Sequence, residues 1–161
     1  MESALYILTG YTAVGKTRLS LEWAKANDAE IISCDSLLFY KCMDIGTAKP
    51  SMEELAEVRH HLINVVPASK QYSISEYLKA AKEAVTDIHK RGKRVLVVGG
   101  SGFYLNAFFA PVVDNLKLDP KERNRIEKIF RKQALETSVD MLRKLNPDGL
   151  GGLDIHNPRR V

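Results

Sequence analysis

A glycine-rich stretch near the start of the chain carries the residues whose spacing is most typical of phosphate binding. Residues 10–17, GYTAVGKT, match the pattern G-x-x-x-x-G-K-[ST] at every fixed position. In such a loop backbone N–H groups converge on an anion, and the start of the following helix adds further donors. Lys16 would supply a mobile positive charge, and the Thr17 hydroxyl a ligand for Mg²⁺. The stretch therefore predicts a site for a di- or triphosphate, but it leaves the reaction open.

A carboxylate is expected to lie beside this loop. The apolar run 5–8 predicts a strand, residues 17–27 a helix, and residues 30–34 a second strand that ends at Asp35. In an open parallel sheet the carboxyl ends of the strands line the ligand crevice, so Asp35 should face the bound phosphates. There it could accept a proton from a substrate.

The remaining chain continues the alternation of helix and strand. A helix over 73–91 begins with a Ser73–Glu76 capping box, and the apolar strand 94–100 leads into a second glycine-rich turn that offers the Ser101 hydroxyl. Further predicted elements are a long connection over 36–50, a helix over 52–58, a strand over 61–66, a helix over 103–109, a helix from 119 and a helix over 138–145. This pattern predicts an α/β fold of the P-loop NTPase type, with a parallel sheet flanked by helices.

The positive charge is concentrated in the last third of the chain. Residues 1–116 carry 13 Lys and Arg against 13 Asp and Glu, whereas residues 117–161 carry 11 against 7. We therefore expect a phosphate-binding catalytic core over 1–116 and a basic helical segment over 117–161. The basic segment indicates an anionic partner such as nucleic acid, although a solvated helix face would have similar composition.

We expect a soluble, cytoplasmic protein that does not bind a membrane, and we expect it to be a monomer. The chain enters its first predicted strand within a few residues of Met1, and no apolar run approaches the length of a membrane span. The two cysteines, Cys34 and Cys42, form neither a disulfide framework nor a metal-binding pair, so we expect both to be buried thiols.

Three functions fit these residues. A small-molecule kinase would use Asp35 to deprotonate an acceptor hydroxyl, with Lys16 and Mg²⁺ at the transferred phosphoryl group. In a transfer to carbon, the diphosphate would instead be the leaving group, and Asp35 would take a proton from the attacking nucleophile. A nucleotide-dependent RNA-binding module would need no catalysis. The phosphate loop alone does not separate them.

The order of several short motifs closely resembles the tRNA dimethylallyltransferase family, also called tRNA isopentenyltransferases. The resemblance extends over essentially the whole chain and rests on GYTAVGKT, DSLLFY at 35–40, DIGTAKP at 44–50, HHLI at 60–63, YSISEY at 72–77, VGGSGFY at 98–104 and NPRRV at 157–161. The family transfers a dimethylallyl group from dimethylallyl diphosphate to N6 of the adenosine 3′ of the anticodon in tRNA. The resemblance therefore implies a prenyltransferase that uses Mg²⁺.

The resemblance also implies roles for single residues. Asp35 would be the general base on the adenine amine, and Ser101, where family members usually have Thr, would lie beside the reacting groups. The diphosphate would be held by Gly10, Thr12, Ala13, Val14, Gly15, Lys16 and Thr17, with Thr17 also toward the metal. The tRNA would meet Asp35, Ser36, Leu37, Leu38, Ser101, Arg123, Arg159 and Arg160. Family members are considerably longer, so we expect these 161 residues to end before the C-terminal part and to be a poor catalyst alone.

Overall fold

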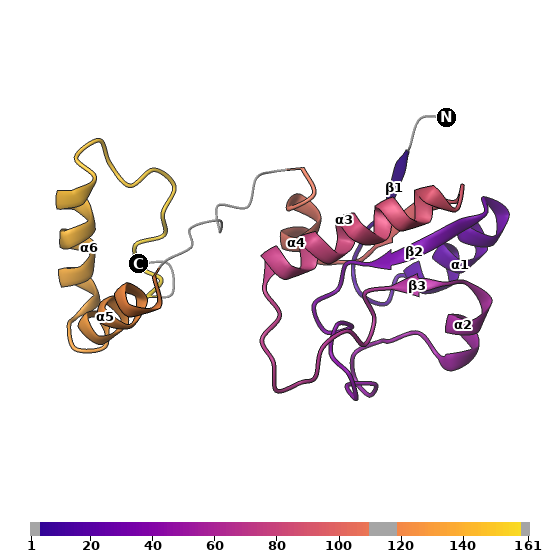
Figure 1. The fold of residues 1–161 in the computed structure, drawn as a ribbon, viewed down its shortest axis with the longest axis horizontal. Helices are drawn as coiled ribbons and strands as arrows, with labels where there is room; N and C mark the ends of the chain where they lie inside the picture. The colour runs from indigo at the N-terminus through magenta and orange to yellow at the C-terminus, as the bar shows by residue number, and fades with distance from the viewer. Residues whose placement is uncertain (1–3, 110–118, 159–161) are drawn as a thin grey trace. The chain divides into compact units, whose positions relative to one another are not determined.

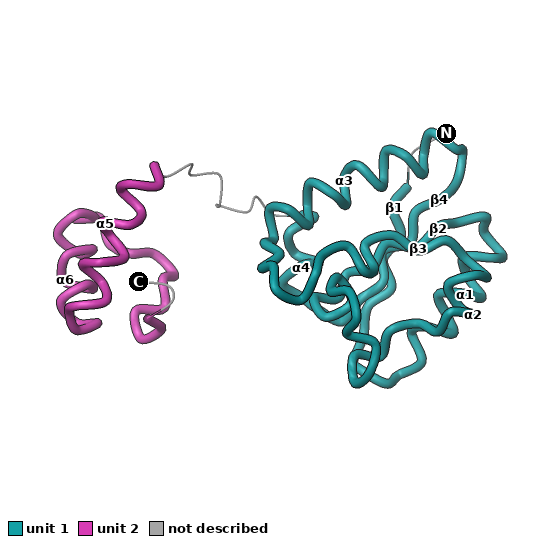
Figure 2. The backbone as a smooth tube through the Cα atoms, turned by 60° about the horizontal axis from the view of Figure 1, so that its bottom comes forward, with its two compact units in different colours: residues 1–115 teal, residues 116–161 magenta. Residues whose placement is uncertain are grey.

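The computed structural model describes residues 4–109 and 119–158, which belong to two compact units, Met1–Asn115 and Leu116–Val161 (Figure 2). The first unit contains β1 (Leu5–Leu8), α1 (Lys16–Ala26), β2 (Ala29–Ser33), α2 (Met52–Glu57), β3 (His60–His61), α3 (Ile74–Lys90), β4 (Arg94–Val98) and α4 (Gly102–Asn106). The second contains α5 (Pro120–Phe130) and α6 (Leu135–Leu145). In the described parts of both units, no helix is long and apolar enough to cross a bilayer.

The strands form one parallel sheet in the order β1-β4-β2-β3. Strand β4 lies between β1 and β2, with Leu5 opposite Val95 and Ala29 opposite Arg94. The last strand, β3, pairs with β2 through His60 and His61. This arrangement confirms the predicted α/β fold with a parallel sheet flanked by helices.

Each face of the sheet packs against its own helices (Figure 1). In β4, Val95 and Val97 point into the core that α3 covers, whereas Leu96 packs with Leu21 and Ala24 of α1. Successive strand residues face opposite sides, so a strand buried on both faces is apolar throughout. Helices therefore cover both faces of the sheet, and the loops that follow its strands lie at their carboxyl ends.

Helix α3 has clear start and stop signals in its sequence. The Ser73 hydroxyl accepts a hydrogen bond from the Glu76 amide, while the Glu76 carboxylate accepts one from the Ser73 amide. After Lys90 the chain turns at Gly92, whose φ of 73° suits a residue without a side chain. The predicted capping box and helix end are confirmed.

The predicted strand over 61–66 is wrong in its extent. β3 ends at His61, and Leu62 and Asn64 adopt positive φ values of 62° and 57°, which a strand does not permit. The backbone of residues 64–66 instead pairs with the connection after Asp35: the Lys41 amide donates to the Val66 carbonyl at 2.8 Å. Residues 64–66 therefore pair with the connection after Asp35, whereas the apolar run alone suggested that they pair with the edge of the sheet.

The second unit begins with a capped helix. The Asp119 carboxylate accepts from the Lys121 amide at 2.8 Å, and Pro120 occupies the first turn of α5, which confirms the predicted helix from 119. Helix α6 starts at Leu135, three residues before the predicted start, and buries Ser138 and Val139. Ser138 therefore lies inside this helix rather than at its beginning.

Candidate functional site

The phosphate loop leaves β1 and ends at the first turn of α1. Gly15 has φ 87° and Ala13 φ 67°, so the backbone curls in the left-handed region immediately before the helix. No side chain caps α1, and residues 12–15 are exposed. The first N–H groups of an 11-residue helix are consequently presented to solvent at the loop, where an anion is favoured.

The Lys16 ammonium is folded against the beginning of its own loop. Its Nζ donates to the Gly10 carbonyl at 2.9 Å and to the Tyr11 carbonyl at 2.6 Å. These bonds use two of its three donors, which leaves one for an incoming oxygen. The cation is thereby held at the mouth of the loop instead of extending into solvent.

The second glycine-rich turn lies directly against both the loop and β2. A Cβ on Gly99 would stand 2.1 Å from the Cys34 carbonyl oxygen, and one on Gly100 would stand 3.2 Å from the Gly10 carbonyl oxygen and 3.8 Å from Lys16 Nζ. At Gly99 only a residue without a side chain fits such an approach. The two glycines therefore bring the ends of β1, β2 and β4 into one place, which spacing alone did not reveal.

Asp35 follows β2 at this same edge. The Cys34 amide donates to the Val98 carbonyl at 2.7 Å, which fixes the end of β2 against β4 immediately before Asp35. The Asp35 Oδ1 accepts from the Leu37 amide at 3.0 Å, and the half-buried carboxylate remains at the site edge. Ser36 and Leu38 are half-buried as well, while Leu37 is exposed. A turn of four residues thus presents both a proton acceptor and apolar surface.

Ser101 caps α4 through its backbone, because the Leu105 amide donates to its carbonyl at 3.1 Å. Its hydroxyl makes no capping bond to the helix. The residue directly follows Gly100, which borders Lys16. Its side chain is half-buried. A hydroxyl in this position is suited to a hydrogen bond with a ligand that lies between the two glycine-rich turns.

Cys34 is a structural residue rather than a nucleophile. Burial raises the pKa of its thiol to about 11, against a weaker lowering effect of Tyr77, so it stays protonated at neutral pH. The Tyr77 hydroxyl donates to the neighbouring Ser33 carbonyl at 3.2 Å. The expectation that both cysteines are buried holds for Cys34 only, since Cys42 is exposed on the loop that follows Asp35.

The described part of the chain contains no cluster of side chains that could enclose a metal ion. Among residues 4–109 and 119–158, His, Cys, Asp and Glu side chains nowhere gather in threes that could bind one. The half-buried Thr17 hydroxyl at the start of α1 remains a suitable single ligand. Such a donor set fits Mg²⁺, which keeps several waters and is commonly held through substrate phosphates.

A buried ion cluster lies at the opposite end of β2, where the sequence indicated nothing. The Glu30 side chain, 5% exposed, accepts from Arg91 Nη2 at 2.7 Å and contacts His61 Nε2 at 2.6 Å. Burial alone would raise the pKa of Glu30, but the hydrogen bonds of Arg91 and His61 outweigh it and hold the pKa below its usual value. Glu30 lies near the start of the otherwise mostly apolar β2, and its partner Arg91 is 61 positions away, so the sequence gives no local sign of the pair.

The second unit carries the remaining predicted tRNA-binding residues. Arg123 is exposed on α5, where its Nε lies 3.3 Å from Glu127 Oε1. Arg125 and Arg131 also pair with glutamates of the same helix, at 3.3 and 3.9 Å. Part of the basic charge is therefore offset within α5. Arg159 and Arg160 lie outside the described residues.

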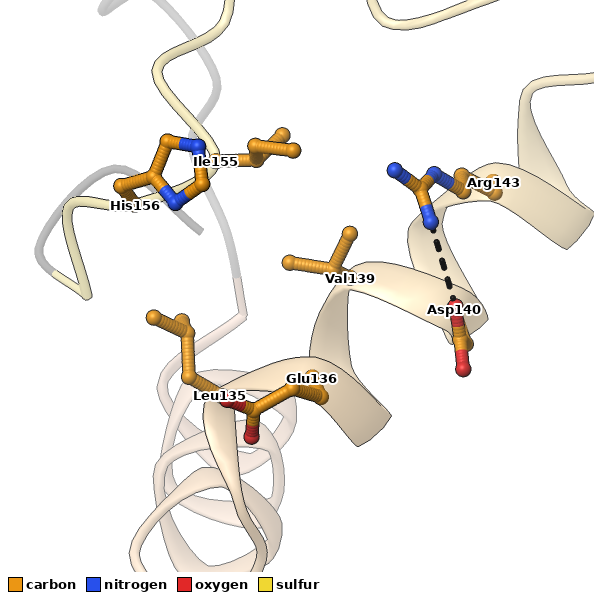
Figure 3. Close-up of a pocket in the computed structure, with 7 residues that line it drawn as sticks. All are labelled: Leu135, Glu136, Val139, Asp140, Arg143, Ile155 and His156. Carbon is orange, nitrogen blue, oxygen red and sulfur yellow. Dashed lines mark hydrogen bonds and ion pairs between the residues drawn. The ribbon is translucent and has the colours of Figure 1, made fainter.

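A hollow beside α6 has a mixed apolar and charged lining (Figure 3). Leu135, Val139 and Ile155 give it an apolar floor, and Arg143 at its rim pairs with Asp140 at 3.4 Å. Its remaining lining residues are Glu136 and His156. With the carboxylates of Glu136 and Asp140 beside Arg143, this hollow carries no excess of positive charge that would favour a phosphate.

Comparison with known proteins relates the chain to one family. The family model described as IPP transferase matches residues 38–161. The chain is 53% identical over 157 residues to the tRNA dimethylallyltransferase of Opitutus terrae, covering 98% of this chain and 50% of that protein. It is 38% identical to the tRNA dimethylallyltransferase of Deinococcus radiodurans, covering 96% of this chain and 50% of that protein.

Solved structures resemble the chain in the same way. The full-length tRNA isopentenylpyrophosphate transferase from Bacillus halodurans superposes with a TM-score of 0.68 at 35% identity, covering 99% of this chain and 53% of that chain. A eukaryotic dimethylallyltransferase acting on tRNA gives a TM-score of 0.82 at 32% identity, covering 98% of this chain and 39% of that chain. The chain spans about half the length of the curated relatives that it matches. It belongs to the IPP transferase family.

Proposed function

We propose that the protein transfers a dimethylallyl group from dimethylallyl diphosphate to N6 of the adenosine 3′ of the anticodon in tRNA. The observation that carries this proposal is the meeting of three loops at one edge of the sheet, where Gly100 lies close to the Gly10 carbonyl oxygen and Lys16 Nζ, and Gly99 lies against Cys34, the residue before Asp35. In this proposal the three loops supply a phosphate cradle and a proton acceptor to one site. The names of the relatives support the same substrates.

In the proposed reaction the backbone N–H groups of residues 12–17 and the Lys16 ammonium bind the diphosphate. The adenine N6 forms a bond to the first carbon of the dimethylallyl group, the bond from that carbon to oxygen breaks, and its electron pair leaves with the diphosphate. The Asp35 carboxylate takes the proton from N6. Ser101 would donate a hydrogen bond beside the reacting groups, and Ser36, Leu37 and Leu38 would contact the base.

A Mg²⁺ ion held by the Thr17 hydroxyl and the diphosphate would supply charge neutralisation for the leaving group. The adenine must leave its stack to reach Asp35, because N6 is inaccessible within a stacked loop. Cations of the second unit, with Arg123, Arg159 and Arg160 among them, would contact tRNA phosphates. We propose that the protein acts as a monomer in the cytoplasm, with the chain of 161 residues being a poor catalyst by itself.

One assay distinguishes this proposal from its alternatives. The full-length protein is incubated with Mg²⁺, unmodified tRNA and labelled dimethylallyl diphosphate, and in parallel with labelled ATP and candidate small-molecule acceptors. We expect label on tRNA, and an Asp35→Asn variant should lose at least about 100-fold in kcat because general-base catalysis contributes about that much. Asp28→Asn is the matched control, since this exposed residue precedes β2 and pairs with Lys93 instead.

The outcomes separate the three functions. Phosphoryl transfer from ATP to a small acceptor would establish a kinase and overturn the proposal. Binding of RNA that depends on nucleotide but persists unchanged in Asp35→Asn, without transfer to tRNA, would instead indicate a non-catalytic module.

A further inference from the structure

A buried lysine beside the site has no part in the function proposed so far. The Lys49 side chain is only 4% exposed, although it lies in the long connection that follows Asp35. Its Nζ donates to the Tyr40 carbonyl at 3.0 Å, to Asp44 Oδ1 at 2.7 Å and to Asn64 Oδ1 at 2.8 Å. All three ammonium donors are therefore satisfied by protein.

These three acceptors come from two separate segments of the chain. Tyr40 and Asp44 belong to the connection after Asp35, whereas Asn64 belongs to the segment after β3. Asp44 is 66% exposed, so the ammonium is buried by the loop around it rather than by its charged partner. Lys49 consequently joins the two segments at one point.

The joined segments also pair through their backbones. The Asn64 amide donates to the Leu38 carbonyl at 3.0 Å, and the Val65 and Val66 amides donate to the Phe39 carbonyl at 2.8 and 3.0 Å. Leu38 in turn donates its amide to the Asp35 carbonyl at 3.2 Å. A continuous set of hydrogen bonds thus runs from Lys49 to the backbone of Asp35.

The backbone around Lys49 adopts conformations that need support. Cys42 and Ala48 have φ values of 61° and 52°, and Asn64 has 57°. Non-glycine residues in this region persist only where the surroundings hold them. A central cation with three acceptors is such a support, since it constrains both segments at once.

We propose that Lys49 is a positioning residue, which holds residues 35–41 in place so that Asp35 and Leu38 face the substrate base. This inference rests on the proposed function for the identity of the base. It assigns to the tRNA side of the site a residue that does not itself touch substrate. The diphosphate site is built on β1 and α1, so replacing Lys49 should change diphosphate binding much less than it changes the reaction with tRNA.

The first test needs no enzymatic activity. Amide hydrogen exchange is compared in the unaltered protein, in Lys49→Met and in Lys41→Met, an exposed lysine of the same connection. We expect the Leu38, Lys41 and Val65 amides to exchange at least about tenfold faster in Lys49→Met only, because local opening is easier there. The Gly99 amide, which donates to Leu8, should be unaffected. Unchanged exchange over 38–41 would overturn the inference.

The second test is kinetic. In Lys49→Met, kcat/KM for tRNA should fall by about tenfold or more, while KM for dimethylallyl diphosphate changes by less than about twofold. Lys49→Arg should recover part of the loss, since it keeps the cation beside Asp44. Equal losses for both substrates would indicate a merely structural role and would overturn the inference.

The two tests fail differently. An unaltered protein that transfers no dimethylallyl group would contradict the proposed function, while hydrogen exchange would still decide whether Lys49 holds residues 35–41. If Lys49→Met does not fold, Lys49→Gln decides, because normal exchange over 38–41 in that variant, which lacks the cation, would contradict the inference.

Discussion

Replacing Gly99 by alanine should damage the site through a single methyl group. Its Cβ would lie 2.1 Å from the Cys34 carbonyl oxygen, 2.6 Å from the carbonyl carbon and 2.8 Å from the Cys34 Cβ. These atoms belong mainly to backbone that is hydrogen-bonded to β4, so relief requires the ends of two neighbouring strands to separate. The usual cost of overpacking is about 1–3 kcal/mol, and we expect the upper end or more.

Thermal unfolding is the direct assay. Tm falls by roughly 4 °C for each kcal/mol lost from the free energy of unfolding, so a loss of about 3 kcal/mol should lower Tm by about 12 °C. Gly102→Ala is the matched control, since its Cβ would meet nothing within 4 Å and it lies in α4, where alanine is favoured. If Gly99→Ala unfolded at the temperature of Gly102→Ala, the close approach of β4 to β2 would be refuted as a structural requirement.

Two further variants test other parts of the molecule. Glu30→Gln should cost about 3 kcal/mol at neutral pH, because it leaves Arg91 without its buried carboxylate. Since the pKa of Glu30 is lowered on folding, its contribution is present above the ordinary value of 4.5 and is lost as pH falls through the folded value. Chemical unfolding at pH 7 and pH 3 should therefore show a smaller difference between variant and unaltered protein in acid, and an equal difference would contradict the ion pair. Lys128→Ala, on α5, should reduce the slope of log affinity for tRNA against log salt by about 0.7–0.9, measured by filter binding, while an unchanged slope would remove Lys128 from the tRNA surface. Lys82→Ala, at an exposed position on α3, is the control variant for the salt slope.

The sequence predicted best those features that depend on neighbouring residues. The phosphate loop, the capping box at Ser73 and the parallel strands follow from local patterns, and the structure has each of them. Asp35 could be placed at the sheet edge because strand ends in a parallel sheet meet there. Such inferences need only the period of the pattern and the general rules of the fold.

Features that depend on distant residues could not be predicted in this way. The contact of Gly99 with Cys34 joins residues 65 positions apart, and the ring of acceptors around Lys49 includes Asn64 from the segment after β3. The predicted strand over 61–66 failed for the same reason, because its hydrogen-bond partners lie in the connection after Asp35. An apolar run indicates burial but does not identify the partner.

The order of the strands has a consequence for when the site can form during synthesis. β1 has β4 as its neighbour in the sheet, and Leu5 lies opposite Val95, 90 residues later in the chain. The phosphate loop is therefore made first, but its supporting strand is among the last parts of the first unit to leave the ribosome. Until then β1 carries an exposed edge that must be kept from other chains. A nascent chain that pauses before Arg94 would hold every residue of the loop and still lack the surface against which that loop is folded.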